Sequence, residues 1–110
     1  MSTSKLDAPI KSYIEAANAH DVDAVARCFA DDAVVTDEGR DRRGAAAIRD
    51  WADEVSRKYR PTVEPLSAVA ISGRTVVTSR VSGDVPGSPV DLRYEFSVDG
   101  EKIKRLEIAP

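Results

Sequence analysis

Apolar residues recur at spacings of three and four in two segments near the start of the chain. Positions 6, 10, 13, 14 and 17 are apolar and predict one face of a helix that begins near Asp7, with Pro9 in its first turn. A second helix carries Val22, Val25 and Phe29 and ends at the turn signal of residues 30–32. Asp21 precedes this helix and is expected to cap it. The sequence therefore opens with two short helices.

The next segment changes from strand to loop to helix. Residues 33–37 form a short β-branched run that predicts a strand ending at Asp37. Residues 38–43 are polar and alternate in charge, which is typical of a loop or a hairpin tip. Gly44 opens a third helix, and Arg60 ends it because the residue before a proline is disfavoured in the helical region.

The remainder of the chain has the pattern of consecutive strands. Residues 62–71 and 75–82 flank a tight turn, and residues 90–98 alternate strictly between apolar and polar positions. Asp99-Gly100 is a strong hairpin signal. It leads into residues 101–108, where the alternation shifts phase between Ile103 and Leu106, as a β-bulge would cause.

Helices followed by consecutive strands predict an α+β fold, with a largely antiparallel sheet and helices on one face. At 110 residues the chain is expected to be one domain, residues 1–110, because this length supports a single core. Apolar residues make up 42% and charged residues 32%, an ordinary balance for a folded chain.

Composition excludes several function classes. The net charge is -3 and no basic stripe stands out, so we expect no nucleic-acid partner. No apolar run approaches the ~20 residues of a membrane span, and residues 1–12 lack the apolar core of a signal peptide, which favours a cytoplasmic protein. With one His and one Cys and no glycine-rich phosphate loop, we expect neither a metal site nor a cofactor.

Two ionisable side chains are candidates for chemistry. Asp37 ends an apolar strand, and a carboxyl group inside an apolar cavity has its pKa raised by desolvation, as a general base near neutral pH requires. The alternative is a loop carboxylate paired with Arg40, Arg42 or Arg43. Tyr13 lies on the apolar face of the first helix, so it is either a core tyrosine or a hydroxyl that reaches a ligand.

Three further aromatic residues extend this candidate site. Trp51 lies on the inner face of the third helix, where it is either core or the apolar wall of a ligand pocket. Tyr94 and Phe96 point to the same side of their strand. His20 lies in the turn between the first two helices and is expected at the surface, whereas Cys28 is expected to be a small buried hydrophobe.

Several segments resemble one protein family. NAHDVDAVARCFADDAVVTD, RRGAAAIRDW and VSGDVPGSPVDLRYEFSVDGEKIKRLEI are similar to the SnoaL-like / ketosteroid isomerase-like branch of the NTF2-like superfamily. The resemblance covers nearly the whole chain. It implies an NTF2-like cone, in which three N-terminal helices pack on a curved, mostly antiparallel sheet. It also implies a homodimer that pairs through the sheet.

The resemblance also implies roles for the candidate residues. Asp37 falls on the position of the catalytic base, Tyr13 on the oxyanion tyrosine and Trp51 on an aromatic pocket residue. The family's protonated aspartate has no counterpart here, and Tyr94 stands at its strand position. A neutral phenol donates a hydrogen bond, so Tyr13 and Tyr94 could form the oxyanion pair.

Two functional hypotheses follow. The first is a cofactor-independent isomerase or cyclase that acts on an apolar carbonyl compound, with Asp37, Tyr13 and Tyr94 as catalytic residues and Trp51 and Phe96 as pocket residues. The second is a non-catalytic ligand-binding or protein-interaction domain. The second hypothesis expects Asp37 to be exposed and paired with an arginine, and the cavity to be small or filled by Trp51.

Overall fold

The computed structural model describes residues 6–110 and contains three helices and one six-stranded sheet. Residues 1–5, the beginning of the segment considered for a signal peptide, lie outside the described residues. The helices are α1 (Ala8–Asn18), α2 (Val22–Arg27) and α3 (Ala45–Tyr59). The strands are β1 (Phe29–Asp37), β2 (Arg40–Arg43), β3 (Thr62–Ile71), β4 (Arg74–Ser82), β5 (Val90–Asp99) and β6 (Lys102–Ala109).

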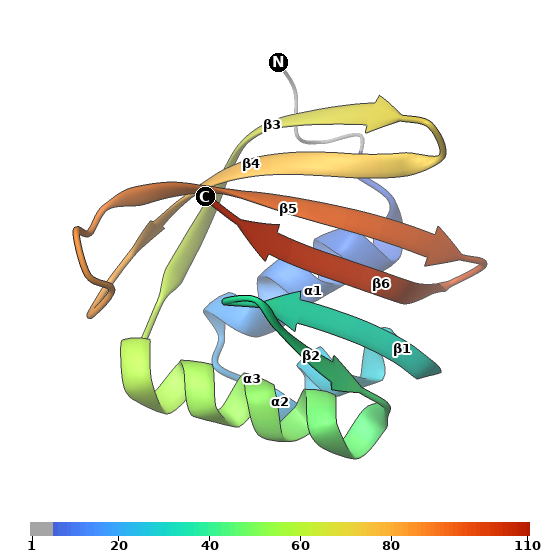
Figure 1. Ribbon diagram of the computed structural model, residues 1–110, viewed down its shortest axis with the longest axis horizontal. Helices are drawn as coiled ribbons and strands as arrows, with labels where there is room; N and C mark the ends of the chain where they lie inside the picture. The colour runs from blue at the N-terminus through green and yellow to red at the C-terminus, as the bar shows by residue number, and fades with distance from the viewer. Residues whose placement is uncertain (1–5) are drawn as a thin grey trace.

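The predicted α+β class is confirmed, and the helices lie together against the curved sheet (Figure 1). The strand order is β2-β1-β6-β5-β4-β3. Every neighbouring pair is antiparallel except β1 and β6, which run parallel. The parallel pair arises because the chain leaves β2, forms α3 and the hairpins β3–β4 and β5–β6, and returns beside β1. Only α1 and α2 precede the sheet, because α3 follows the first two strands.

The residues that the sequence predicts to begin, cap and end the helices have these roles in the structure. Pro9 lies in the first turn of α1, and the Asp21 side chain accepts a hydrogen bond from the Ala24 N–H at 3.1 Å, which caps α2. Helix α3 ends at Tyr59, and Arg60 adopts a left-handed conformation with φ 44° immediately before Pro61.

Two predicted boundaries are wrong around β1 and β2. The second helix ends at Arg27, and the strand begins at Phe29 rather than after the aspartate turn. The reason is pairing with β6: the Ile103 N–H donates to the Cys28 carbonyl at 2.8 Å, and Phe29 lies beside Ile103. The polar segment after Asp37 contains the short strand β2 at the edge of the sheet, whose charged residues are exposed except for the partly buried Arg42.

The last hairpin contains the predicted bulge. Ser97 pairs with Arg105 and Val98 pairs with Ile103, so Lys104 is the extra residue. The shift turns both Ile103 and Leu106 into the core, where each is fully buried.

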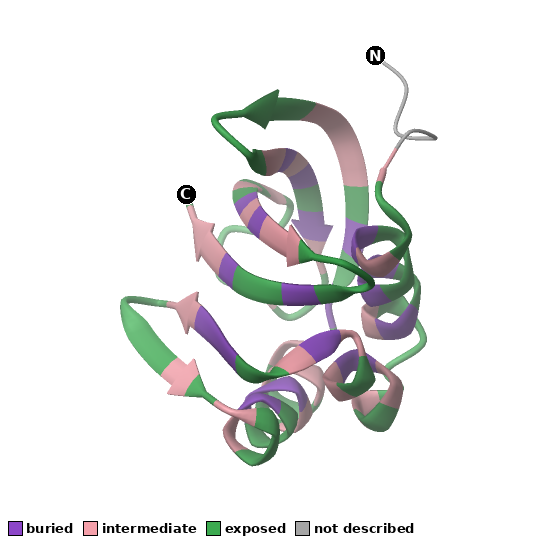
Figure 2. Ribbon diagram, turned by 90° about the vertical axis from the view of Figure 1, so that its right-hand side faces the viewer, coloured by how far each residue is buried: buried purple, intermediate pink, exposed green. Residues whose placement is uncertain are grey.

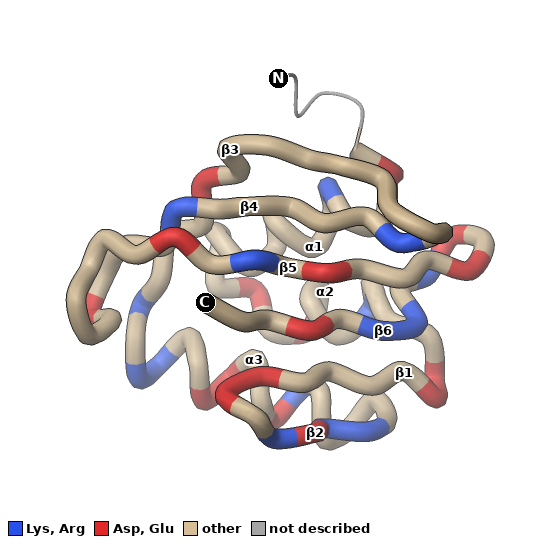
Figure 3. The backbone as a smooth tube through the Cα atoms, turned by 45° about the horizontal axis from the view of Figure 1, so that its top comes forward, with Lys and Arg blue, Asp and Glu red and all other residues tan. Residues whose placement is uncertain are grey.

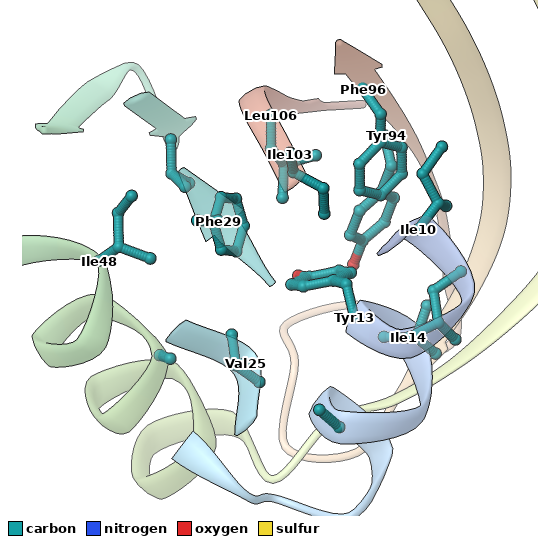
Figure 4. Packing of buried hydrophobic residues seen from close by; sticks show 14 of the residues in the cluster. Ile10, Tyr13, Ile14, Val25, Phe29, Ile48, Tyr94, Phe96, Ile103 and Leu106 are labelled. Atoms are coloured by element: carbon teal, nitrogen blue, oxygen red, sulfur yellow. The ribbon is translucent and has the colours of Figure 1, made fainter. Parts of the chain in front are cut away.

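The core fills the space between the sheet's inner face and the helices. Buried residues alternate along β4 and β5, are three positions apart across the bulge of β6, and form one side of α1 and α3 (Figure 2). Tyr13 is central to this packing. Its ring contacts Phe29 and Phe96 edge to face, with ring centroids 5.8 and 5.7 Å away (Figure 4). Among the described residues, no helix is long and apolar enough to cross a membrane.

Candidate functional site

A cavity of about 840 Å³ lies between the inner face of the sheet and the helices. Tyr13 of α1, Asp37 of β1, Trp51 of α3 and Tyr94 of β5 all line it. Most of its remaining wall is aliphatic, including Val22, Val25, Val55, Val81, Leu92 and Ile108. A cavity of this size with few polar groups matches the general description of small-molecule sites.

Asp37 reaches this cavity because of its strand register. It alternates with the fully buried Val35, so its carboxyl group points inward at the end of β1. The Trp51 indole N–H donates to Asp37 Oδ2 at 3.0 Å. Partial burial raises the pKa of Asp37, and the nearby charge of Glu38 raises it further. The hydrogen bond from Trp51 acts in the opposite direction and also fixes the carboxyl group in place.

The three arginines after Asp37 do not form an ion pair with it within the described chain. Arg40 lies opposite Asp37 in the β1–β2 ladder and is exposed. Arg42 pairs with Glu54 at 3.3 Å, and its charge has only a small lowering effect on the pKa of Asp37. The second hypothesis expected an exposed, arginine-paired Asp37, and the structure differs because the register turns this side chain toward α3.

Tyr13 and Tyr94 bring two phenols to the same cavity. Both residues are at most 5% exposed, and Tyr94 directs its hydroxyl group toward Tyr13 (Figure 4). No hydrogen bond joins either hydroxyl group to another side chain or backbone group of residues 6–110. Burial raises the pKa of both phenols, and the negative charge of Asp37 raises it further. Each phenol therefore stays protonated near neutral pH and can donate a hydrogen bond to a ligand.

Of the two predicted pocket residues, Trp51 lines the cavity and Phe96 does not. Phe96 is 1% exposed and stacks on Tyr94 with ring centroids 6.3 Å apart, but it is not among the residues that line the cavity. It belongs to the core behind Tyr94, where it supports both tyrosines. Trp51 lines the cavity without filling it, and its N–H is committed to Asp37.

The exposed side of the cavity has polar contacts that the sequence did not predict. The Tyr59 hydroxyl group donates to Glu38 Oε2 at 3.1 Å, which joins the β1–β2 turn to the end of α3. His20, expected at the surface, is exposed and has Nδ1 3.0 Å from the Ser56 hydroxyl group. All four residues line the cavity. We call Glu38, Tyr59, His20 and Ser56 the rim.

The loop 83–89 closes one side of the cavity through Val85 and Pro86. It is held against α3 because the Asp84 N–H donates to the Tyr59 carbonyl at 2.7 Å. Nothing in the periodicity of the sequence marks these residues, since their role depends on two segments meeting in space. In residues 6–110, no group of three or more His, Cys, Asp or Glu side chains is arranged to hold a metal ion.

The fold and this cavity define a class of protein. Residues 10–106 match the SnoaL-like domain family, and the chain belongs to that family within the NTF2-like superfamily. No curated protein matches the sequence.

Three solved structures illustrate the similarity. A protein of Sinorhizobium meliloti, provisionally named a polyketide cyclase, is 36% identical, with a TM-score of 0.92 over 98% of this chain and 99% of that chain. A Catenulispora acidiphila protein with a ketosteroid isomerase-like fold, in complex with trimethylamine, has a TM-score of 0.82 at 16% identity, over 99% and 87% of the two chains. SalBIII, an epoxide hydrolase/cyclase-like enzyme of pyran ring formation in salinomycin, has a TM-score of 0.80 at 21% identity, over 92% and 86%. The last two comparisons show the fold alone.

Proposed function

We propose that the protein binds a small, mostly apolar carbonyl compound in the cavity and acts on it as a cofactor-independent isomerase or cyclase. The observation that carries this proposal is the arrangement of Asp37, Tyr13 and Tyr94 around one cavity, with Asp37 held by Trp51. The name given to the Sinorhizobium meliloti relative is consistent with the cyclase chemistry.

In the proposed reaction Asp37 is the general base. Its carboxylate takes a proton from the carbon next to the substrate carbonyl group, and the electron pair of that C–H bond moves to form an enolate. Tyr13 and Tyr94 donate hydrogen bonds to the enolate oxygen. In an isomerase, Asp37 returns the proton to another carbon of the conjugated system. In a cyclase, the enolate carbon attacks a second carbonyl group of the same molecule: a C–C bond forms, the π bond of that carbonyl breaks, and its oxygen takes the proton from Asp37.

The pKa shifts favour these roles. A carboxyl group with a raised pKa is a stronger base than an ordinary aspartate. The two phenols have raised pKa values and remain neutral donors. The aliphatic wall lowers the local polarity, which strengthens hydrogen bonds to the developing negative charge.

The test is exchange of the acidic C–H protons of 2-tetralone, a flat apolar ketone, in deuterated buffer, followed by proton NMR. The native protein should accelerate the exchange. Asp37→Asn keeps the shape of the side chain and should reduce the acceleration by about 10²–10⁴-fold. Tyr13→Phe and Tyr94→Phe should each reduce it by a smaller factor. Asp32→Asn, at an exposed position of β1 outside the cavity, is the matched control.

The same experiment addresses the non-catalytic alternative. If 2-tetralone binds and the native protein does not accelerate its exchange, the ligand-binding module is favoured. If the native protein accelerates the exchange and Asp37→Asn leaves the rate unchanged, the assigned base is wrong. Loss of exchange in the Asp32→Asn control would show that the effect is general and not specific to Asp37.

We also propose that the protein forms a homodimer through the outer face of the sheet. That face carries pairs of opposite charge, including Arg74 with Glu95 at 3.1 Å and Arg80 with Asp91 at 3.2 Å (Figure 3). Such a surface suits a hydrated interface rather than a dry one. Light scattering that gives the mass of a monomer at high concentration would contradict the dimer.

A further inference from the structure

The charged side chains of the cavity are predominantly acidic. Among the described residues that line it, none is Lys or Arg, whereas Asp37, Glu38, Asp91 and Glu107 are acidic. His20 is the remaining ionisable group apart from the tyrosines. The charge of the lining therefore differs from that of the whole chain, in which 16 basic residues nearly balance 19 acidic ones.

Two of these four carboxylates belong to the outer face of the sheet. Asp91 alternates with Leu92 on β5 and forms an ion pair with Arg80 at 3.2 Å. Glu107 alternates with Ile108 on β6 and lies 4.0 Å from Arg105. On that face the positive charges of Arg80 and Arg105 compensate the charges of these two carboxylates. Asp37 and Glu38 are the carboxylates that act on the cavity, one inside it and one at the rim.

Basic side chains near these carboxylates lie outside the cavity lining, although Lys58 is close enough to Glu38 for the two charges to interact. Arg42 forms its ion pair with Glu54 at 3.3 Å. Lys58 is exposed and does not line the cavity, and its Nζ lies 5.0 Å from the centroid of the Tyr59 ring. A negatively charged ligand in the cavity would thus find no guanidinium or ammonium partner on its wall.

The aromatic lining strengthens this bias. Tyr13, Trp51, Tyr59 and Tyr94 contribute four rings from α1, α3 and β5. The face of an aromatic ring attracts a cation, and the effect is larger where water is excluded. At the rim, the Tyr59 hydroxyl group holds the Glu38 carboxylate at 3.1 Å, which keeps a negative charge beside an aromatic ring.

A carboxylate ligand would lose hydration and face two negative groups, whereas an ammonium group at the rim would gain attraction from Glu38 and from the rings. We propose that the cavity selects organic cations, with an apolar body inside the cavity and an amine or quaternary ammonium group at the rim, and that it rejects carboxylates and phosphates. This inference rests on the proposed function, since it names the charge class of the ligand for the same site.

The experiment compares three cyclohexyl compounds that differ at one end of a short alkyl tether. The ends are a trimethylammonium group, a neutral dimethylamide and a carboxylate. Binding is followed in low-salt buffer by the fluorescence of Trp51, the single tryptophan of the chain, which lines the cavity. The ammonium compound should bind about tenfold more tightly than the amide, and the carboxylate about tenfold more weakly than the amide.

A matched pair of variants assigns the preference to the rim. Glu38→Gln should weaken binding of the ammonium compound by about three- to tenfold and leave binding of the amide unchanged. Glu15→Gln removes the same charge from an exposed position of α1 outside the cavity and should change neither.

The outcomes separate the inference from the proposed function. Equal binding of the ammonium and amide compounds, or an ammonium preference that survives Glu38→Gln, would overturn the charge selectivity while ligand binding in the cavity stands. Tightest binding of the carboxylate would also overturn it, and loss of that binding in Lys58→Gln would identify the basic group responsible. If none of the three compounds binds, the inference is wrong, and the exchange of 2-tetralone decides separately whether the proposed function stands.

Discussion

The hydrogen bond from Trp51 to Asp37 makes a pH-dependent contribution to stability that Trp51→Phe should remove. The substitution keeps an aromatic ring on α3 and deletes the indole N–H that lies 3.0 Å from Asp37 Oδ2. In the native protein this bond opposes the effect of burial on the pKa of Asp37. Without it, that pKa should rise further above its ordinary value.

The size of the effect follows from the charge on the acceptor. A hydrogen bond to an ionised group contributes about 1.5–3 kcal/mol, compared with about 0.5–1.5 kcal/mol between neutral groups. Asp37 is half-buried, so water replaces part of the lost bond, and we expect a loss of about 1–2 kcal/mol at about pH 8. In a chain of this length the melting temperature should fall by roughly 4–8 °C.

At about pH 4 the loss should be smaller, because Asp37 is then protonated in a larger share of folded molecules. The direction follows from linkage. The folded pKa of Asp37 is raised above the unfolded one, so Asp37 favours the folded state at low pH, and this contribution disappears as the pH rises from the unfolded pKa through the folded pKa. Trp51→Phe should raise the folded pKa, so the pH range over which this contribution is lost should extend to higher pH.

Urea unfolding at both pH values measures the stability, and the carbon chemical shift of the Asp37 carboxyl group measures its pKa by NMR. The control is Trp51→Phe in an Asp37→Asn background, where the loss should be the same at both pH values. An equal loss at both pH values with Asp37 present, or a carboxyl pKa that falls in the variant, would refute the reasoning.

Two further predictions concern the segments that shape the cavity. Gly83→Ala places a methyl group 2.6 Å from the Arg60 carbonyl oxygen. It should lower the free energy of unfolding by about 1–3 kcal/mol more than Gly73→Ala, which also has a positive φ (78°, compared with 126° at Gly83) but open space around it. Equal losses in urea unfolding would show that the contact relaxes freely. Asn18→Ala removes side-chain bonds to the Val63 carbonyl and N–H at 2.9 and 2.7 Å and should cost about 1–3 kcal/mol. Unchanged hydrogen exchange of the Val63 amide in that variant would contradict this link between α1 and β3.

Much of the fold is determined locally and was predicted from the sequence. Asp21 caps α2 wherever that helix packs, and the proline after Arg60 ends α3 in any context. Asp99-Gly100 sets the last hairpin because Gly100 adopts φ 63° at little steric cost. The boundary at Phe29 depends instead on β6, which lies more than seventy positions later in the chain. No local propensity contains that information, which is why the sequence predicts a second helix that is longer than the one in the structure.

For the candidate site, the sequence predicts that Tyr13, Trp51 and Tyr94 face inward and leaves Asp37 between the cavity and an arginine pair. The tertiary structure decided where Asp37 points and what each of these residues meets. Alternation along β1 and β5 turned Asp37 and Tyr94 to the inner face, and helical periodicity did the same for Tyr13 and Trp51. Packing decided that Asp37 bonds to Trp51 rather than to an arginine, that Phe96 lies behind Tyr94, and that Glu38 meets Tyr59 at the rim. The physical reason is the distance along the chain over which each property is set. Side-chain direction follows from the backbone geometry of a few neighbouring residues, whereas a cavity and the charge around it exist only when segments distant in sequence pack together.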